Sequence, residues 1–196
     1  MLQVKKNKKY KHYKNILVTG GCGFIGSHLV DRLVLEGFNV FVIDNLLTGL
    51  KENINKKANY YFHDINDYVS NNATFRELVL DNKIKTVFHL AACTDVSVSV
   101  ENPLYAYRTN LLSSISIINE SYKAGVKKFV FASTSAVYGE PKYLPVDEDH
   151  PTIPISPYGL TKLGFEQYLE YSDIRNNISF FIFRLPNVYG PRQRSD

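Results

Sequence analysis

The sequence predicts an α/β protein built on a doubly wound parallel sheet. From Asn15 onward, short β-branched or aromatic runs alternate with longer segments of helical periodicity, as in a parallel sheet covered on both faces. A glycine-rich turn follows the first of these runs, where a strand must enter a helix. The 196 residues correspond to about one domain, so a full core can form without disulfides.

The expected strands and helices alternate along the chain. Gly37 follows the first helix and Gly125 the third, where a left-handed residue is least costly as glycine. The segment from Pro141 to Pro157 is predicted to be a long loop over the carboxyl edge of the sheet, the edge where such folds bind ligands. The strands are expected at Ile16–Thr19, Val40–Ile43, Tyr60–His63, Thr86–Leu90, Phe129–Ala132 and Phe180–Phe183, and the helices at Phe24–Glu36, Asp67–Asp81, Leu104–Lys123 and Pro157–Ser172.

The composition excludes several classes of protein. Hydrophobic residues make up 44% and charged residues 21%, which excludes a disordered, collagen-like or disulfide-framework chain. No apolar run reaches the roughly 18 residues of a membrane span, so we expect no membrane partner. Cys22 and Cys93 lack metal-ligand spacing and suit a reducing compartment, so we expect no metal site and a cytoplasmic setting.

The formal net charge of +4 comes from the start of the chain. Residues 1–14 hold six lysines and no acid, whereas the other residues hold 17 basic and 19 acidic side chains. We interpret residues 1–14 as a solvated basic tail, with a binding arm as the less favoured alternative. The domain at residues 15–196 is therefore not basic, and we expect no nucleic-acid partner.

Gly20, Gly23 and Gly26 follow the first strand at G-x-x-G-x-x-G spacing. Bare backbone at such a turn lets N–H groups and the positive helix end approach a pyrophosphate, although glycines also make ordinary turns. The second strand ends at Asp44, whose carboxylate could accept hydrogen bonds from an adenosine ribose or could be a solvated turn residue. A carboxylate repels a 2′-phosphate, which favours NAD over NADP.

Tyr158 and Lys162 lie four residues apart on the last expected helix, so they share one face. Ser156 and Pro157 mark the start of that helix. An ammonium beside a phenol favours the phenolate and lowers its pKa from about 10 toward a value useful to a general base. This pair is therefore a candidate for proton transfer.

The same spacing occurs by chance elsewhere in the chain. Tyr10 and Lys14 lie in the basic tail, and Tyr138 and Lys142 have Pro141 between them, which prevents a regular helical turn. Of the three pairs, that of Tyr158 and Lys162 is the one that lies at a predicted helix start. Ser133–Ser135 follows the fifth strand, where its hydroxyls could meet a ligand oxygen or could form a turn cluster.

With these features in order, the sequence resembles the extended short-chain dehydrogenases that act on nucleotide sugars, most closely the UDP-glucose 4-epimerases. The resemblance covers residues 15–194 and implies a Rossmann fold in which the family's small C-terminal substrate lobe is missing. The matching stretches are Val18–His28, Asp44–Gly49, Asp64–Ile65, His89–Ala92, Glu101–Pro103, Asn110, Ser133–Gly139, Tyr158–Lys162 and Arg184–Pro191.

The resemblance implies NAD as the cofactor. The first turn of the first helix would contact the pyrophosphate, the loops after the second and third strands the adenosine, and the remaining residues the nicotinamide half. The implied NAD-binding residues are Gly20, Gly23, Phe24, Ile25, Gly26, Asp44, Asn45, Leu46, Leu47, Thr48, Gly49, Asp64, Ile65, Leu90, Ala91, Ala92, Thr94, Asn110, Tyr158, Lys162 and Pro186.

The resemblance also implies epimerisation at C4 of a nucleotide sugar of the UDP-glucose/UDP-galactose type. Tyr158 would take the proton from the 4-hydroxyl while hydride passes to NAD⁺, and Thr134 would orient that oxygen. The 4-keto sugar would then turn over and take the hydride back on its other face. Thr134, Tyr158 and Lys162 are the implied catalytic residues, and Thr134, Tyr158 and Asn187 the implied substrate contacts.

Two kinds of alternative remain. Related dehydratases and decarboxylases carry carboxylates where this chain has Ser135 and Ala136, which favours epimerisation over both. The family continues past the Gly-Pro-Arg motif into a C-terminal lobe, whereas this chain stops at Asp196. A catalytically inactive NAD-binding fragment or sensor is therefore the rival hypothesis.

The resemblance further implies a homodimer. Family members usually dimerise through a bundle of the helices expected here at Leu104–Lys123 and Pro157–Ser172. The apolar residues of the first helix could serve that interface or could equally be ordinary core. These residues include Leu111, Leu112, Ile115 and Ile118.

Overall fold

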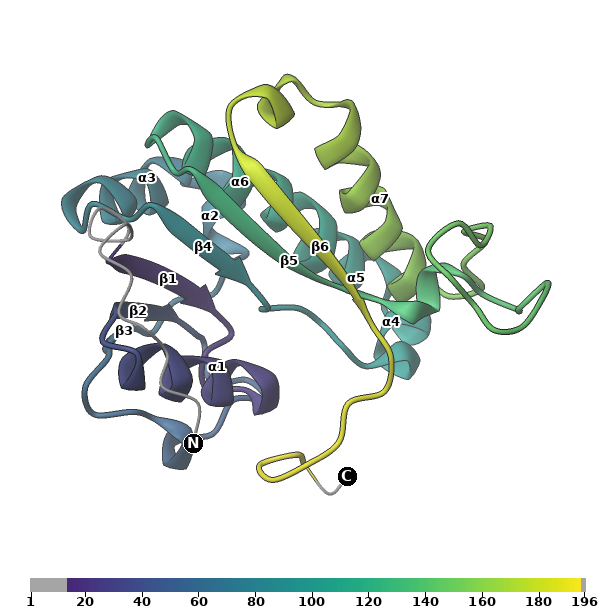
Figure 1. The fold of residues 1–196 in the computed structure, drawn as a ribbon, viewed down its shortest axis with the longest axis horizontal. Coiled ribbons are helices and arrows are strands. Elements are labelled where there is room, and N and C mark those ends of the chain that lie inside the picture. Colours follow the sequence, from purple (N-terminus) through teal and green to yellow (C-terminus); the bar gives the residue numbers. More distant parts are fainter. Residues whose placement is uncertain (1–13, 195–196) are drawn as a thin grey trace.

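The computed structural model describes residues 14–194, and within them a parallel six-stranded sheet has the order β3-β2-β1-β4-β5-β6 (Figure 1). The order reverses between β1 and β4, which creates a crevice at the carboxyl edge of the sheet. The predicted doubly wound sheet is thus confirmed. Its strands are β1 (Asn15–Thr19), β2 (Asn39–Ile43), β3 (Asn59–Tyr61), β4 (Thr86–His89), β5 (Lys128–Thr134) and β6 (Ser179–Leu185).

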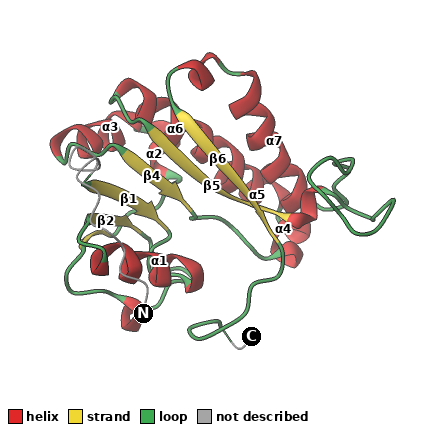
Figure 2. Cartoon of the chain, in the orientation of Figure 1, coloured by secondary structure: helices red, strands yellow, loops and turns green. Residues whose placement is uncertain are grey.

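Helices lie on both faces of the sheet (Figure 2). On one face lies α1 (Phe24–Leu35), and on the other lie α3 (Asn72–Asp81), α6 (Ser113–Lys123) and α7 (Pro157–Tyr171). The basic tail predicted at residues 1–14 falls almost entirely outside the described residues. The short elements are α2 (Asp67–Ser70), α4 (Val96–Glu101), α5 (Pro103–Tyr107), the π-helical η3 (Arg108–Leu112) and the 3₁₀ turns η2 (Lys51–Asn53), η4 (Ser135–Val137) and η5 (Asp173–Asn176).

Two helical regions differ from the expectation. The helix expected at Asp67–Asp81 is split into α2 and α3 because Asn71 has non-helical dihedrals, φ −130° and ψ 67°. The helix α4 was not expected, since its V-S-V-S-V-E sequence alternates as a strand would. It forms because the Asp95 carboxylate accepts the backbone N–H groups of Ser97 and Val98, at 2.7 and 3.1 Å.

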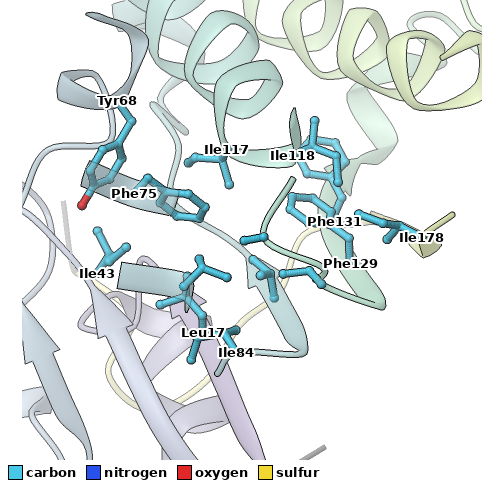
Figure 3. Close-up of a cluster of buried hydrophobic side chains, with 14 of the residues drawn as sticks. Leu17, Ile43, Tyr68, Phe75, Ile84, Ile117, Ile118, Phe129, Phe131 and Ile178 are labelled. Atoms are coloured by element: carbon cyan, nitrogen blue, oxygen red, sulfur yellow. The ribbon is translucent and has the colours of Figure 1, made fainter. Parts of the chain in front are cut away.

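The strands β1 to β4 contribute alternate side chains to two separate cores, whereas β5 and β6 contribute to the larger one. On the α1 face, Val18 and Val42 pack with Val30 of α1. On the opposite face, a larger cluster combines strand residues with aromatic and aliphatic side chains of α3, α6 and α7, and Figure 3 shows Leu17, Phe75, Ile117 and Phe131 within it. This two-sided burial fixes the register of β1, so its carboxyl end reaches the crevice.

A buried histidine links β1, β4 and α6. His89 is fully buried, with Nδ1 2.7 Å from Thr19 Oγ1 and Nε2 2.8 Å from Ser114 Oγ. The Ser114 hydroxyl donates to the carbonyl oxygen of Asn110, so it accepts from Nε2–H, and Nδ1 accepts from Thr19. Burial and, to a smaller extent, the charge of Lys162 lower the pKa of His89 to about 3. The imidazole is therefore neutral in the folded protein.

This network makes stability depend on pH. His89 in the unfolded chain has a pKa of about 6.5. Between that value and about 3 the unfolded state binds the extra proton, so the unfolding free energy falls by up to about 1.4 kcal/mol per pH unit as the pH drops. Urea denaturation at pH 7 and pH 5 should show this loss in the wild type and a smaller loss in His89→Gln, whose amide keeps one donor and one acceptor. Equal losses in both proteins would contradict this account.

Candidate active site

The turn after β1 depends on its first and last glycines. Gly20 has φ +73°, and a Cβ there would lie 2.8 Å from the backbone nitrogen of Ala91. A Cβ on Gly26 would lie 2.0 Å from the carbonyl oxygen of Gly20. Any side chain at either position would therefore push α1 or the loop after β4 away from the turn.

The middle glycine has a different environment. Among the described residues, a Cβ on Gly23 would meet one atom within 4 Å, the Gly20 carbonyl oxygen at 3.3 Å. Gly23 is the N-cap residue of α1, and it has no side chain that could accept the N–H groups of the first turn. That turn contains no acidic residue. The N–H groups that begin α1 at Phe24, Ile25 and Gly26 therefore receive no hydrogen bond from a cap side chain, an arrangement that suits a pyrophosphate.

Asp44 lies at the carboxyl end of β2, beside this turn. Its Oδ2 accepts the backbone N–H of Cys22 and its Oδ1 that of Leu46, both at 2.8 Å. A Cβ on Gly49 would lie 2.8 Å from Oδ1, so the loop closes tightly over the carboxylate. Each oxygen still has a lone pair that could accept a ribose hydroxyl. Burial and the Asp44 charge raise the pKa of Cys22 to about 12, so Cys22 stays a thiol.

The loops after β2 and β3 are tied to each other. Asn45 Nδ2 donates to Asp64 Oδ2 at 2.9 Å, and Asn45 Oδ1 accepts the N–H of Leu47 at 3.0 Å. The residues predicted to surround the adenosine, including the exposed Thr48, are thus brought together. Ile65 is an exception. Its side chain is buried in the main core, so its backbone is the part that a ligand could contact.

Asn110 holds the loop after β4 in place. Its Oδ1 accepts the N–H of Cys93 at 2.8 Å, while Nδ2 donates to the Cys93 carbonyl at 2.9 Å and to Thr161 Oγ1 at 3.2 Å. The side chain is buried, and both amide hydrogens are used inside the protein. The predicted cofactor residues Leu90–Thr94 lie on this loop, so Asn110 acts on the site by fixing their backbone.

The start of α7 brings the predicted catalytic residues together. Ser156 Oγ accepts the N–H of Gly159 at 3.1 Å and caps the helix. One turn further, Lys162 Nζ donates to the Ala132 carbonyl at 2.9 Å and lies 6.0 Å from the ring centroid of Tyr158. Thr134, at the end of β5, forms a side-chain hydrogen bond with Tyr158.

The pKa of Tyr158 differs from the prediction. We expected Lys162 to lower it, but burial raises it above the ordinary value, and the hydrogen bond from Thr134 opposes that rise. The ammonium is directed to the Ala132 carbonyl and not to the phenol oxygen. Burial also lowers the pKa of Lys162 to about 8, although the charges of Cys93 and Glu166 raise it. Lys162 is therefore a cation at neutral pH and loses its charge under mildly alkaline conditions.

The sequence reasoning missed an ion pair that anchors α7. Glu166 Oε2 lies 2.7 Å from Arg184 Nη2, and the same carboxylate accepts the hydroxyl of Ser133. Arg184 Nη1 also donates to the hydroxyl of Tyr138 at 3.1 Å. The available signal was the position of Glu166, four residues after Lys162 on the same helix face.

A pocket of about 810 Å³ opens beside this ion pair. It is lined by residues of β6, of the loop at residues 139–148 and of α7, including Tyr138, Glu148 and Arg184. Pro186 also lines it, whereas the predicted substrate contact Asn187 follows in the exposed segment that leaves β6. Thr134, Tyr158 and Lys162 are not among the residues that line this pocket.

The fold and the site define a Rossmann-type domain of the extended short-chain dehydrogenase type, with a Tyr-Lys pair at the carboxyl edge. The chain belongs to the NAD dependent epimerase/dehydratase family, whose model matches residues 16–196. A UDP-glucose 4-epimerase of Lactobacillus helveticus is 42% identical over 177 residues, which are 89% of this chain and 52% of that protein.

Solved structures agree with this assignment. A Thermotoga maritima UDP-glucose 4-epimerase with UDP-glucose superposes with a TM-score of 0.86 at 42% identity, covering 92% of this chain and 58% of that one. A Thermus thermophilus UDP-glucose 4-epimerase complex with NAD gives a TM-score of 0.86 at 38% identity, covering 93% and 58%. The chain thus spans little more than half the length of these relatives. Within the described residues, no helix has the length and apolar character needed to cross a bilayer.

The two outer positions of the turn should respond differently from the middle one. Gly26→Ala places a methyl group against the Gly20 carbonyl and should lower the unfolding free energy by about 2 kcal/mol or more. Gly23→Ala should lower it by less, about 1 kcal/mol or under, because the added methyl group meets one atom, the Gly20 carbonyl oxygen at 3.3 Å. Urea denaturation measures both, and equal losses would show that the turn is packed differently.

Proposed function

We propose that this chain binds NAD at the carboxyl edge of the sheet and supports epimerisation at C4 of a UDP-sugar. The observation that carries the proposal is one juxtaposition. The uncapped start of α1 and the buried Asp44 lie on one side of the crevice, and Thr134, Tyr158 and Lys162 lie on the other. A dinucleotide bound across such a crevice extends from the first group to the second.

The residues of the site fit NAD in their chemistry. The start of α1 offers N–H groups without a side-chain cap to a pyrophosphate, and Asp44 offers acceptors to a ribose that carries free hydroxyls. The lysine at the far end would contact the second ribose. Bound NAD supplies a hydride acceptor that can return the hydride, which is the chemistry that reversible oxidation of a sugar alcohol needs.

Tyr158 would act as the general base. Its phenol oxygen takes the proton of the sugar 4-hydroxyl and gives it back after the ring has turned over. The Thr134 hydroxyl donates a hydrogen bond that favours the phenolate, and the Lys162 ammonium adds positive charge to the site below about pH 8. Because burial raises the pKa of Tyr158, both contributions are needed at neutral pH.

Epimerisation is favoured over water loss or decarboxylation by the residues that follow Thr134. Ser135 and Ala136 form the turn η4 and supply no carboxylate there. The buried carboxylate of Glu166 is paired with Arg184 and bonded to Ser133, so it is not available as a second acid. Epimerisation needs one proton-transfer group, which Tyr158 provides.

Binding without turnover is the second candidate function. It is favoured by the environment of Tyr158, because burial raises the pKa of its phenol and the Lys162 ammonium is directed to the Ala132 carbonyl. On this alternative, the glycine turn and Asp44 hold NAD in the same way, and no UDP-sugar is turned over.

Turnover separates the two functions. Incubated with NAD and UDP-galactose, the chain, or a version extended to the length of its relatives, should produce UDP-glucose, measured by chromatography. Tyr158→Phe should slow this reaction about 100-fold or more without loss of NAD binding. Tyr143→Phe, which removes a hydroxyl bonded to Asp147 in the loop, is the matched control and should keep the wild-type rate. NAD binding with no turnover in either length of protein would leave the second candidate as the function.

We further propose that the chain dimerises through α5, η3 and α7. Leu104, Leu112 and Leu160 expose large apolar areas on these elements, Leu104 being 81% exposed. Ile118, which we had also considered for the interface, is fully buried in the core. The unburied leucines are therefore what a second copy would cover.

The proposed interface can be tested with charged substitutions. Light scattering should give twice the mass of one chain for the wild type and a single chain for Leu104→Glu/Leu112→Glu, since a dimer would bury both charges. Leu35→Glu, at an 80% exposed position on α1, is the control and should remain dimeric. A monomeric wild type at micromolar concentration would refute the interface.

A further inference from the structure

After β6, the chain turns back along the carboxyl edge of the sheet. Residues 186–194, here called the crossing segment, leave the edge strand and run back to α1 (Figure 1). Arg192 Nη2 lies 2.7 Å from Asp31 Oδ2, and His28 Nε2 lies 2.9 Å from the carbonyl oxygen of Pro191. A Cβ on Gly190 would be 3.7 Å from Phe24 Cζ. The crossing segment is therefore held to α1 by an ion pair and a hydrogen bond.

The sheet order determines where this segment must pass. The strands β4 and β5 lie between β1 and β6, so the path from β6 to β1 covers three strand spacings, about 14 Å. The six residues 186–191 span at most about 20 Å when extended. The segment has little spare length, so it runs close along the edge at which the dinucleotide is proposed to lie.

The Asp31 carboxylate on α1 is oriented toward Arg192 by a second hydrogen bond. Asn55 Nδ2 donates this bond to Asp31 Oδ1 at 2.6 Å. Burial raises the pKa of Asp31, but the hydrogen bonds from Asn55 and Arg192 outweigh it and hold the pKa below its ordinary value. Arg192 has φ +68°, a left-handed conformation that is costly for a residue with a side chain. The ion pair stabilises the backbone in that conformation.

We infer that Asp31 and Arg192 form a clasp that retains the dinucleotide. The inference rests on the proposed function, because it assumes NAD at the uncapped start of α1. Phe24, which begins that helix, lies beside Gly190, and His28, one turn later, is hydrogen-bonded to the Pro191 carbonyl. A dinucleotide held at the turn therefore leaves more readily when the crossing segment detaches from α1. Arg192 and Asp31 are positioning residues in this account, since they act by holding the segment.

The clasp predicts a specific change in the dissociation rate. Partly exposed ion pairs contribute about 0.2–1 kcal/mol, so breaking this one should speed dissociation about 1.4- to fivefold. Stopped-flow fluorescence measures the release of NADH, with excess NAD added to trap the free protein. Arg192→Gln and Asp31→Asn should both release NADH faster, and raised salt should speed release from the wild type more than from either variant.

Two further variants make the test selective. Arg32→Gln breaks the Arg32–Glu36 ion pair on the same helix, 2.8 Å long, and should leave the release rate unchanged. The exchange Asp31→Arg/Arg192→Asp restores opposite charges and should return the rate toward that of the wild type. Hydrogen exchange on the protein without NADH should show faster exchange at residues 186–194 in Arg192→Gln, which tests the anchor without the cofactor.

The outcomes distinguish the clasp from the proposed function. Failure of the wild type to bind NADH would overturn the proposed function and the clasp with it. Normal NADH binding, with equal release rates in the wild type, Arg192→Gln and Arg32→Gln, would overturn the clasp alone. Faster release in both clasp variants, with recovery in the charge exchange, is the result that supports it.

Discussion

The close approach of Gly26 to the carbonyl oxygen of Gly20 is the contact on which the rest of the site depends. It lets α1 begin directly at the end of β1, which leaves the N–H groups after Gly23 uncapped at the crevice. The same turn presents the N–H of Cys22 to Asp44 and so fixes the carboxylate at the end of β2. Because Gly20 and Gly26 have no side chains, this one turn positions both the phosphate end and the ribose end of the proposed cofactor site.

The opposite side of the crevice is held by contacts that join α7 to the sheet. A Cβ on Gly159 would lie 2.7 Å from the Ala136 carbonyl, so this helix also begins against a turn without a side chain between them. One turn beyond Lys162, the pair of Glu166 and Arg184 ties α7 to β6. These contacts keep the lysine buried, and burial is what brings its pKa to about 8. The two halves therefore use the same device, a helix start packed on bare backbone at the carboxyl edge.

Much of this arrangement follows from sequence pattern, because periodicity and glycine spacing are local properties. The alternation of strands and helices, the turn at Gly20 and the helix start before Tyr158 were all predictable in this way. The remainder depends on contacts between distant residues. The pairing of Glu166 with Arg184 requires β6 to lie beside α7, and the raised pKa of Tyr158 requires the depth of burial. The helix α4 was missed because a single cap by Asp95 outweighs a strand-like alternation.

The central claim is that the crevice is a site for NAD, with Asp44 selecting the unphosphorylated ribose. Calorimetric titration of the chain with NAD and with NADP tests it most directly. We expect saturable binding of NAD at one site per chain, and binding of NADP weaker by about tenfold or more, because the buried carboxylate repels a 2′-phosphate. No saturable binding of NAD, or equal affinity for the two dinucleotides, would contradict the account.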